Sequence, residues 1–175
     1  MSDDPSQSSF MEAGLEYLIS GRFAIANRMI AIAGNLYHHG IEYILKSYLL
    51  NTMSVADIRL LGHNLVNIWN KTKSNMPNIE LNKFDSIIQR LNLFERIRYP
   101  DRIIREGAII SFSMTKTPAF KQLNPDVNIP VYELSVEEIE ELVSFLIAIS
   151  RINIKFYVNQ YGNEVIPFLP VPITP

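Results

Sequence analysis

The feature that most constrains the fold is residues 22–50, which contain no proline and carry apolar side chains around most of a helical circumference. Ile25, Met29, Ile32 and Leu36 follow helical spacing and form one stripe, and most of the other faces are apolar as well. A helix that is apolar on nearly all sides packs against several neighbours. At 1.5 Å per residue this helix would be about 43 Å long. The sequence therefore predicts a helical bundle built around it.

Other segments complete the predicted bundle. A short helix ends at Gly62, another begins near His63, and a third spans about residues 79–97, ended by the proline that follows. The last helix begins at Ser135, which forms a capping box with Glu138. The chain is thus predicted to be mostly helical.

Residues 107–134 have a different composition. The stretches AIISFSM and VNIPVYEL are rich in β-branched and aromatic residues, whereas TKTPAFKQLNPD between them is rich in turn formers. We expect a small β-hairpin or an irregular insertion before the last helix.

The two ends of the chain are expected to lie outside the bundle helices. Residues 1–9 are polar and predict a flexible leader, followed by a short amphipathic helix that Gly21 interrupts. Residues 161–175 contain four prolines, which exclude a helix and favour an extended strap along the bundle or along a partner. No internal repeat or domain boundary stands out, so we expect one domain over residues 1–175.

Composition excludes several classes of function. The chain has no cysteine, so disulfides, thiolate metal sites and a cysteine nucleophile are absent. Its 16 Lys and Arg against 18 Asp and Glu give a net charge of −2, which argues against bulk electrostatic binding of nucleic acid but not against a local patch. The start MSDDPSQSSF is not a secretory signal, and no uncharged run reaches the roughly 18 residues of a membrane helix. We expect a cytoplasmic protein with no membrane association.

A polar cluster interrupts the apolar stretch NLYHHGIEYILKSYLL. Glu42 and Lys46 form an i, i+4 ion pair in the favourable orientation. In one interpretation the pair is structural and a histidine satisfies partners inside the bundle; in another, the group lines a cleft and binds a ligand. His38 and His39 point about 100° apart on a helix, so we do not expect them to share one metal ion. His38 and Glu42 supply only two ligands, and we predict no metal site.

His63 lies where a helix is expected to begin. The positive end of the helix dipole disfavours an imidazolium there, which favours a neutral, hydrogen-bonding histidine.

Arginines concentrate in the stretch IIQRLNLFERIRYPDRIIREG. The five arginines here, of nine in the chain, are Arg90, Arg96, Arg98, Arg102 and Arg105, interspersed with Glu95, Asp101 and Glu106. Guanidinium groups suit bidentate contacts with phosphate, which would make this an anion site. Alternating arginine and carboxylate is equally typical of an internal salt-bridge network, in which Asp101 would hold Arg98. Both interpretations stay open.

The order of these motifs resembles the HEPN superfamily. HHGIEYILKSYLL on a long helix, LGHNL at the head of another helix and FERIRYPD before the last helix are similar to the HEPN branch that carries an RYPD element. The resemblance covers residues 24–101, with the terminal helix added by its position. It implies an all-α, antiparallel bundle of four to five helices that forms a homodimer. It also implies a role near RNA or nucleotides, with a nucleotidyltransferase-like protein as one class of partner.

The catalytic motif of the ribonuclease members is missing. Those enzymes, which need no metal, carry an arginine and a later histidine with four to six residues between them, so that the imidazole moves a proton while the guanidinium holds phosphate. No arginine stands at that spacing before His38 or His39, and Arg59 is too close to His63. Tyr157, after Arg151, has the spacing, but a phenol with a pKa of about 10 is a poor proton shuttle. We therefore expect no catalytic residue and no cofactor.

The sequence thus predicts a non-catalytic HEPN-like module that binds RNA or a nucleotide, in a prokaryotic defence or toxin–antitoxin-like system. Two alternatives are a divergent metal-independent ribonuclease and a protein–protein interaction module without a nucleic-acid ligand. The predicted phosphate- or nucleotide-binding residues are Arg96, Arg98, Asp101, Arg102, His39, Glu42, Lys46 and His63.

Overall fold

The computed structural model describes residues 6–115, 129–150 and Asn159, and these are mostly helical, as predicted. Its elements are α1 Gln7–Ala26, α2 Ile30–Leu49, α3 Val55–Leu60, α4 Leu65–Asn75, the 3-10 turn η1 Asn82–Phe84, α5 Asp85–Phe94, the 3-10 turn η2 Glu95–Ile97, α6 Pro100–Glu106, β1 Ile109–Ser113, β2 Val131–Ser135 and α7 Val136–Ile149.

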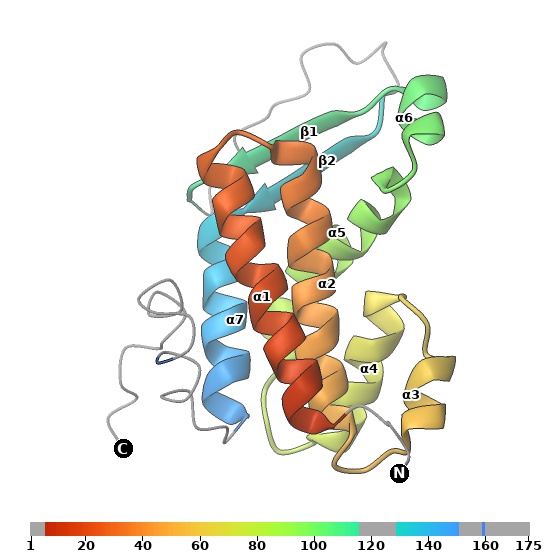
Figure 1. The fold of residues 1–175 in the computed structure, drawn as a ribbon, viewed down its shortest axis with the longest axis vertical. Helices are drawn as coiled ribbons and strands as arrows, with labels where there is room; N and C mark the ends of the chain where they lie inside the picture. The colour runs from red at the N-terminus through yellow and green to blue at the C-terminus, as the bar shows by residue number, and fades with distance from the viewer. Residues whose placement is uncertain (1–5, 116–128, 151–158, 160–175) are drawn as a thin grey trace.

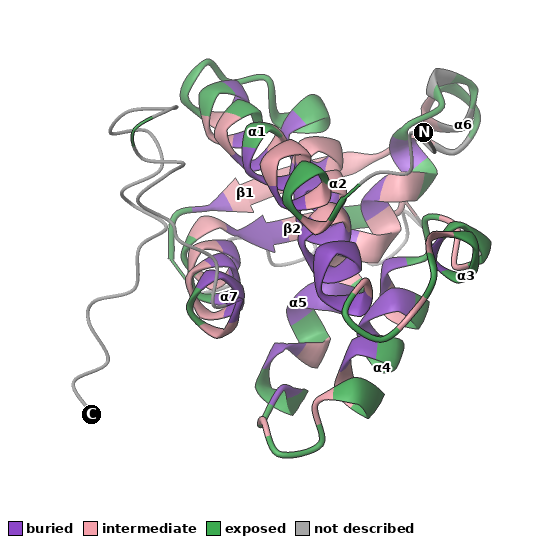
Figure 2. Ribbon diagram, turned by 60° about the horizontal axis from the view of Figure 1, so that its bottom comes forward, coloured by how far each residue is buried: buried purple, intermediate pink, exposed green. Residues whose placement is uncertain are grey.

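Helix α2 is the central element (Figure 1). It packs along α1 and also contacts α4, α5, α7 and β1. Its buried side chains therefore point in several directions, and Figure 2 shows buried residues along most of its length. These contacts on different sides explain why the sequence of α2 is apolar around most of the helix.

The predicted single helix over residues 22–50 is wrong, because the chain turns at residues 27–29 and forms two helices. Asn27 ends α1, and its side-chain amide donates to the carbonyl of Phe23 at 2.8 Å. Arg28 adopts a left-handed conformation with φ of 60°, which breaks the helix. The apolar pattern continues across the turn, although Met29, Ile30 and Ile32 are exposed there rather than packed in the core, and so periodicity did not reveal the break.

Two glycines let α1 and α2 pack closely. A Cβ on Gly14 would lie 3.0 Å from the carbonyl oxygen of Gly40, and a Cβ on Gly40 would lie 2.7 Å from the side chain of Leu18. The backbones can approach this closely only because both positions lack a side chain.

The predicted β-hairpin is also wrong, because β1 and β2 pair in parallel. Ile109 pairs with Val131 and the register runs on to Ser113 and Ser135. A two-residue turn can join only antiparallel strands. Parallel strands need a long connection that returns the chain to the end of the sheet where the first strand began, and the connection between β1 and β2 is long enough for this. Part of that connection, residues 116–128, lies outside the described residues.

Three boundaries differ from the sequence prediction. Residues 7–9 of the predicted leader belong to α1, because the hydroxyl of Ser6 caps it by accepting from the backbone amide of Ser9 at 3.2 Å. The helix expected over residues 79–97 is shorter, with 3-10 turns at both ends. Pro100 does not simply end a helix but begins α6, where proline lacks only an amide that has no helical partner.

Some predictions are confirmed. Ser135 caps α7 by accepting from the amide of Glu138 at 3.3 Å, and α4 buries Leu65, Ile68 and Trp69. The proline-rich segment 161–175 lies outside the described residues. Within residues 6–115 and 129–150, no helix is long and apolar enough to cross a membrane.

One contact joins α2, α5 and the sheet. The fully buried Phe94 ring, at the end of α5, lies against Gly34 of α2 and packs on the rings of Phe112 and Tyr132 at centroid distances of 5.8 and 5.7 Å. The ring thus fixes the end of α5 beside α2, next to the polar cluster described below.

We predict that Gly34→Ala destabilises the fold. Helix propensity alone would make alanine stabilising by about 1 kcal/mol, but a Cβ here would overlap the Phe94 ring. Because Phe112 and Tyr132 hold that ring, we expect the free energy of unfolding to fall by about 1–3 kcal/mol in urea denaturation followed by circular dichroism. Phe94→Leu in the same background should recover part of the loss, and a more stable Gly34→Ala protein would contradict this packing.

Candidate functional site

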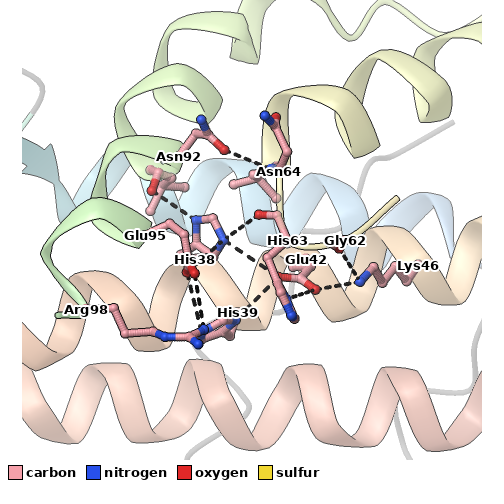
Figure 3. Close-up of polar contacts among 12 residues, drawn as sticks. His38, His39, Glu42, Lys46, Gly62, His63, Asn64, Asn92, Glu95 and Arg98 are labelled. Atoms are coloured by element: carbon pink, nitrogen blue, oxygen red, sulfur yellow. Dashed lines mark hydrogen bonds and ion pairs between the residues drawn. The ribbon is translucent and has the colours of Figure 1, made fainter. Parts of the chain in front are cut away.

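The centre of the site is the carboxylate of Glu42, which is only 1% exposed. Its Oε1 accepts from Lys46 Nζ at 2.6 Å and lies 3.0 Å from His63 Nδ1 (Figure 3). Its Oε2 lies 3.3 Å from His39 Nδ1 and 3.6 Å from His38 Nε2. The expected pair between Glu42 and Lys46 is thus present, and it belongs to a larger cluster.

The cluster keeps Glu42 ionised. Burial by itself raises the pKa of a carboxyl, because it disfavours the charged form. Here hydrogen bonds from His38, His39 and Lys46, together with the charge of Lys46, outweigh burial and hold the pKa of Glu42 well below its ordinary value. A buried charge of this kind is tolerable only while these partners stay in place.

His38 joins three segments of the chain. The side chain is fully buried, and its Nδ1 lies 3.1 Å from the carbonyl oxygen of Leu91 on α5, while its Nε2 lies 3.1 Å from the carbonyl oxygen of His63. Carbonyl oxygens only accept, so the ring nitrogen that carries the proton donates to the carbonyl that it faces. This histidine has the internal structural role considered in the sequence analysis.

The loop before α4 is held onto α2 through its backbone. Gly62 has a φ of 60°, which glycine adopts without steric cost, and its carbonyl oxygen accepts from Lys46 Nζ at 2.7 Å. The next carbonyl is the one that His38 contacts. These two contacts hold the loop against α2. The side chain of His63 consequently lies beside Glu42.

Glu95, in η2, extends the cluster and was not among the predicted site residues. Its Oε1 lies 3.1 Å from Arg98 Nη1. Its Oε2 is buried, has no hydrogen-bond partner among the described residues, and lies 3.9 Å from Nε2 of both His38 and His39. One ligand atom each of His38, His39 and Glu95 thus lies within 4.8 Å of the others, although the two histidines are adjacent on α2 (Figure 3).

The predicted arginine group divides in two. Arg98 is paired with Glu95 rather than with Asp101, and Asp101 instead lies 3.7 Å from Arg105. Arg96 is exposed and has no ion pair or hydrogen bond to any described residue. The side chain of Arg102 lies outside the described part of the chain.

Two hollows adjoin the cluster. One, of about 450 Å³, is lined by Glu95, Arg96, Tyr99, Asp101 and Arg105. The other, of about 320 Å³, is lined by Ser9, Phe10, Glu42, Tyr43, Lys46, Arg59 and His63. The cluster therefore lies between two hollows. The first, called the arginine hollow below, carries Arg96 and Arg105, and the second reaches the buried carboxylate of Glu42.

The structure thus brings most of the predicted residues into two adjoining places. Lys46, Glu42, His39 and His63 form one group, and Arg96 and Asp101 line the hollow beyond Glu95. The sequence did not identify Glu95 as a site residue, because it stands in a stretch where arginines and carboxylates alternate. Arg151 and Tyr157, the suggested catalytic pair of a divergent ribonuclease, lie outside the described residues.

Comparison of the chain with protein-family models, with curated proteins and with solved structures finds no match. The geometry of the site is therefore the basis for any functional inference.

We predict that Glu42→Gln lowers stability strongly and in a pH-dependent way. Removing the carboxylate leaves the ammonium of Lys46 buried without its counter-ion, so we expect a loss of about 3 kcal/mol near pH 7 by urea denaturation. Because the folded pKa of Glu42 is depressed, its contribution is complete above the ordinary value of 4.5 and is lost progressively as the pH falls from there towards the depressed pKa of the folded state.

The difference between wild type and Glu42→Gln should therefore shrink between about pH 5 and pH 3. The exposed Glu80 provides a matched control, since Glu80→Gln should change stability by less than about 0.5 kcal/mol. An equal loss for both variants, or a difference that grows in acid, would argue against a buried ionised Glu42.

Proposed function

We propose that this chain is a non-catalytic HEPN-like module that binds a phosphate-bearing ligand of the RNA or nucleotide class in the hollow beside Glu95. The observation that carries the proposal is the exposed guanidinium of Arg96, which has no ion pair or hydrogen bond to the described residues and lines the same hollow as the exposed ring of Tyr99 and the guanidinium of Arg105.

Arg96 differs from the other arginines near it. Arg90 is paired with Glu138 at 2.6 Å, and Arg98 is paired with Glu95 at 3.1 Å. A guanidinium whose charge is already compensated gains little from a phosphate, whereas Arg96 offers its donors to solvent. This contrast favours Arg96 as the phosphate contact and gives Arg98 a positioning role.

Tyr99 supplies a surface on which a base can stack. The residue is 54% exposed, and the guanidinium carbon of Arg98 lies 5.1 Å from its ring centroid. Such stacking steadies the ring in one orientation. Aromatic rings that stack on bases beside arginines are the usual elements of single-stranded nucleic-acid sites.

The hollow also explains how an acidic protein can bind an anion. Glu95 and Asp101 line it together with the arginines, so its charge is mixed. Carboxylates accept hydrogen bonds from base amino groups but repel phosphate. This composition favours a short stretch of RNA or a single nucleotide, with one phosphate at Arg96, over a long polyanion.

The HEPN assignment is part of the proposal and is supported by the spatial meeting of its three motifs. Glu42 comes from HHGIEYILKSYLL, His63 from LGHNL and Glu95 from FERIRYPD, and all three contact His39 (Figure 3). With it we propose the antiparallel bundle, the cytoplasmic homodimer and the nucleotidyltransferase-like partner that the resemblance implies.

We predict that purified protein binds fluorescently labelled single-stranded RNA in a salt-sensitive manner and leaves it uncut on a gel. Arg96→Ala should weaken binding about tenfold and reduce the slope of log affinity against log salt by about 0.7, the value for one lost phosphate contact. Tyr99→Ala should weaken binding without changing that slope. Fluorescence polarisation over a salt series measures both.

Two variants serve as controls. Arg96→Lys keeps the charge but loses the fork, so it should restore the salt slope and only part of the affinity. Lys71→Ala removes the same charge from an exposed position on α4 outside the hollow and should leave affinity nearly unchanged. Cleavage by wild type alone would favour the divergent ribonuclease. Absence of binding would favour the protein-interaction alternative.

A further inference from the structure

We propose that His39, Glu42 and His63 form a binding site for a divalent transition-metal ion such as Zn²⁺. This inference is independent of RNA binding, since it uses the other hollow and none of the residues assigned to the phosphate contact.

The spacing of the three ligand atoms fits a tetrahedral ion. Glu42 Oε2 lies 3.3 Å from His39 Nδ1 and 3.2 Å from His63 Nδ1. With metal–ligand bonds of about 2.0–2.2 Å, neighbouring ligands of a tetrahedral ion lie about 3.3–3.6 Å apart. One ligand atom of each of the three residues lies within 4.8 Å of the others.

The donor set suits zinc chemically. Two imidazoles and one carboxylate are the protein ligands of a well-known class of zinc sites that keep a further position open. Lys46 occupies Oε1, which leaves Oε2 for the ion and fixes the orientation of the carboxylate.

An ion here would also give a nearby donor to the buried oxygen of Glu95, which has no hydrogen-bond partner among the described residues. With its Nδ1 on the metal, His39 must carry its proton on Nε2, which lies 3.9 Å from Glu95 Oε2. A histidine that binds zinc commonly donates its other N–H to a carboxylate. At 3.9 Å the buried oxygen of Glu95 is beyond hydrogen-bond distance, and a shift of its side chain towards Nε2 would make it that second partner.

The site is accessible from solvent. The side chain of His63 is 57% exposed, and the hollow of about 320 Å³ is lined by both Glu42 and His63. A metal ion could enter by this route, and its remaining coordination position would face the hollow. That position suits water or a small anionic ligand.

The first test is a titration of tag-free, EDTA-treated full-length protein with ZnCl₂ by isothermal calorimetry. We expect one ion per chain, a rise in melting temperature at saturation, and tetrahedral absorption bands when CoCl₂ replaces ZnCl₂. His63→Ala removes a mostly exposed ligand and should keep the fold, by circular dichroism, while weakening binding at least about 100-fold.

A second histidine and a carboxylate variant make the assignment specific. His39→Gln should also lose zinc, whereas Glu95→Gln, which keeps its shape and is not a proposed ligand, should weaken it by about tenfold or less. A folded His63→Ala protein that binds zinc as wild type does would overturn the proposal. So would wild-type protein that binds none, or loss of zinc in Glu95→Gln with retention in His63→Ala, which would assign the ion to His38, His39 and Glu95.

Discussion

The structure depends on one buried negative charge. Glu42 lies at the centre of α2 with 1% of its surface exposed, and an isolated carboxylate there would be strongly unfavourable. Its stability comes from partners on two segments, namely Lys46 and the histidines of α2 and His63 of the loop before α4. Satisfying this charge therefore requires the chain segments to be assembled in one particular way.

Apolar packing and the polar cluster act on the same elements. Phe94 holds the end of α5 against Gly34, and the residue that follows it, Glu95, consequently faces the histidines. Lys46 and His38 bind two successive carbonyl groups of the loop before α4. Packing alone is non-directional, whereas these contacts have defined geometry, so together they fix both the register of the helices and the position of the side chains.

The same arrangement links the two proposed sites. A continuous series of contacts runs from Lys46 through Glu42 and His39 to Glu95 and Arg98 (Figure 3). The arginine hollow lies at one end of this series and the proposed metal ligands at the other.

The sequence by itself determined the helical class, the central place of α2, the cap at Ser135 and the pair of Glu42 with Lys46, since each follows from local spacing and propensity. Only the tertiary structure decided the turn at Arg28, the parallel pairing of β1 with β2, and the meeting of Glu95 with both histidines. Those features arise from contacts between segments far apart in the chain. Local periodicity carries no information about which distant segments will meet, and so the site became visible only once the chain was folded.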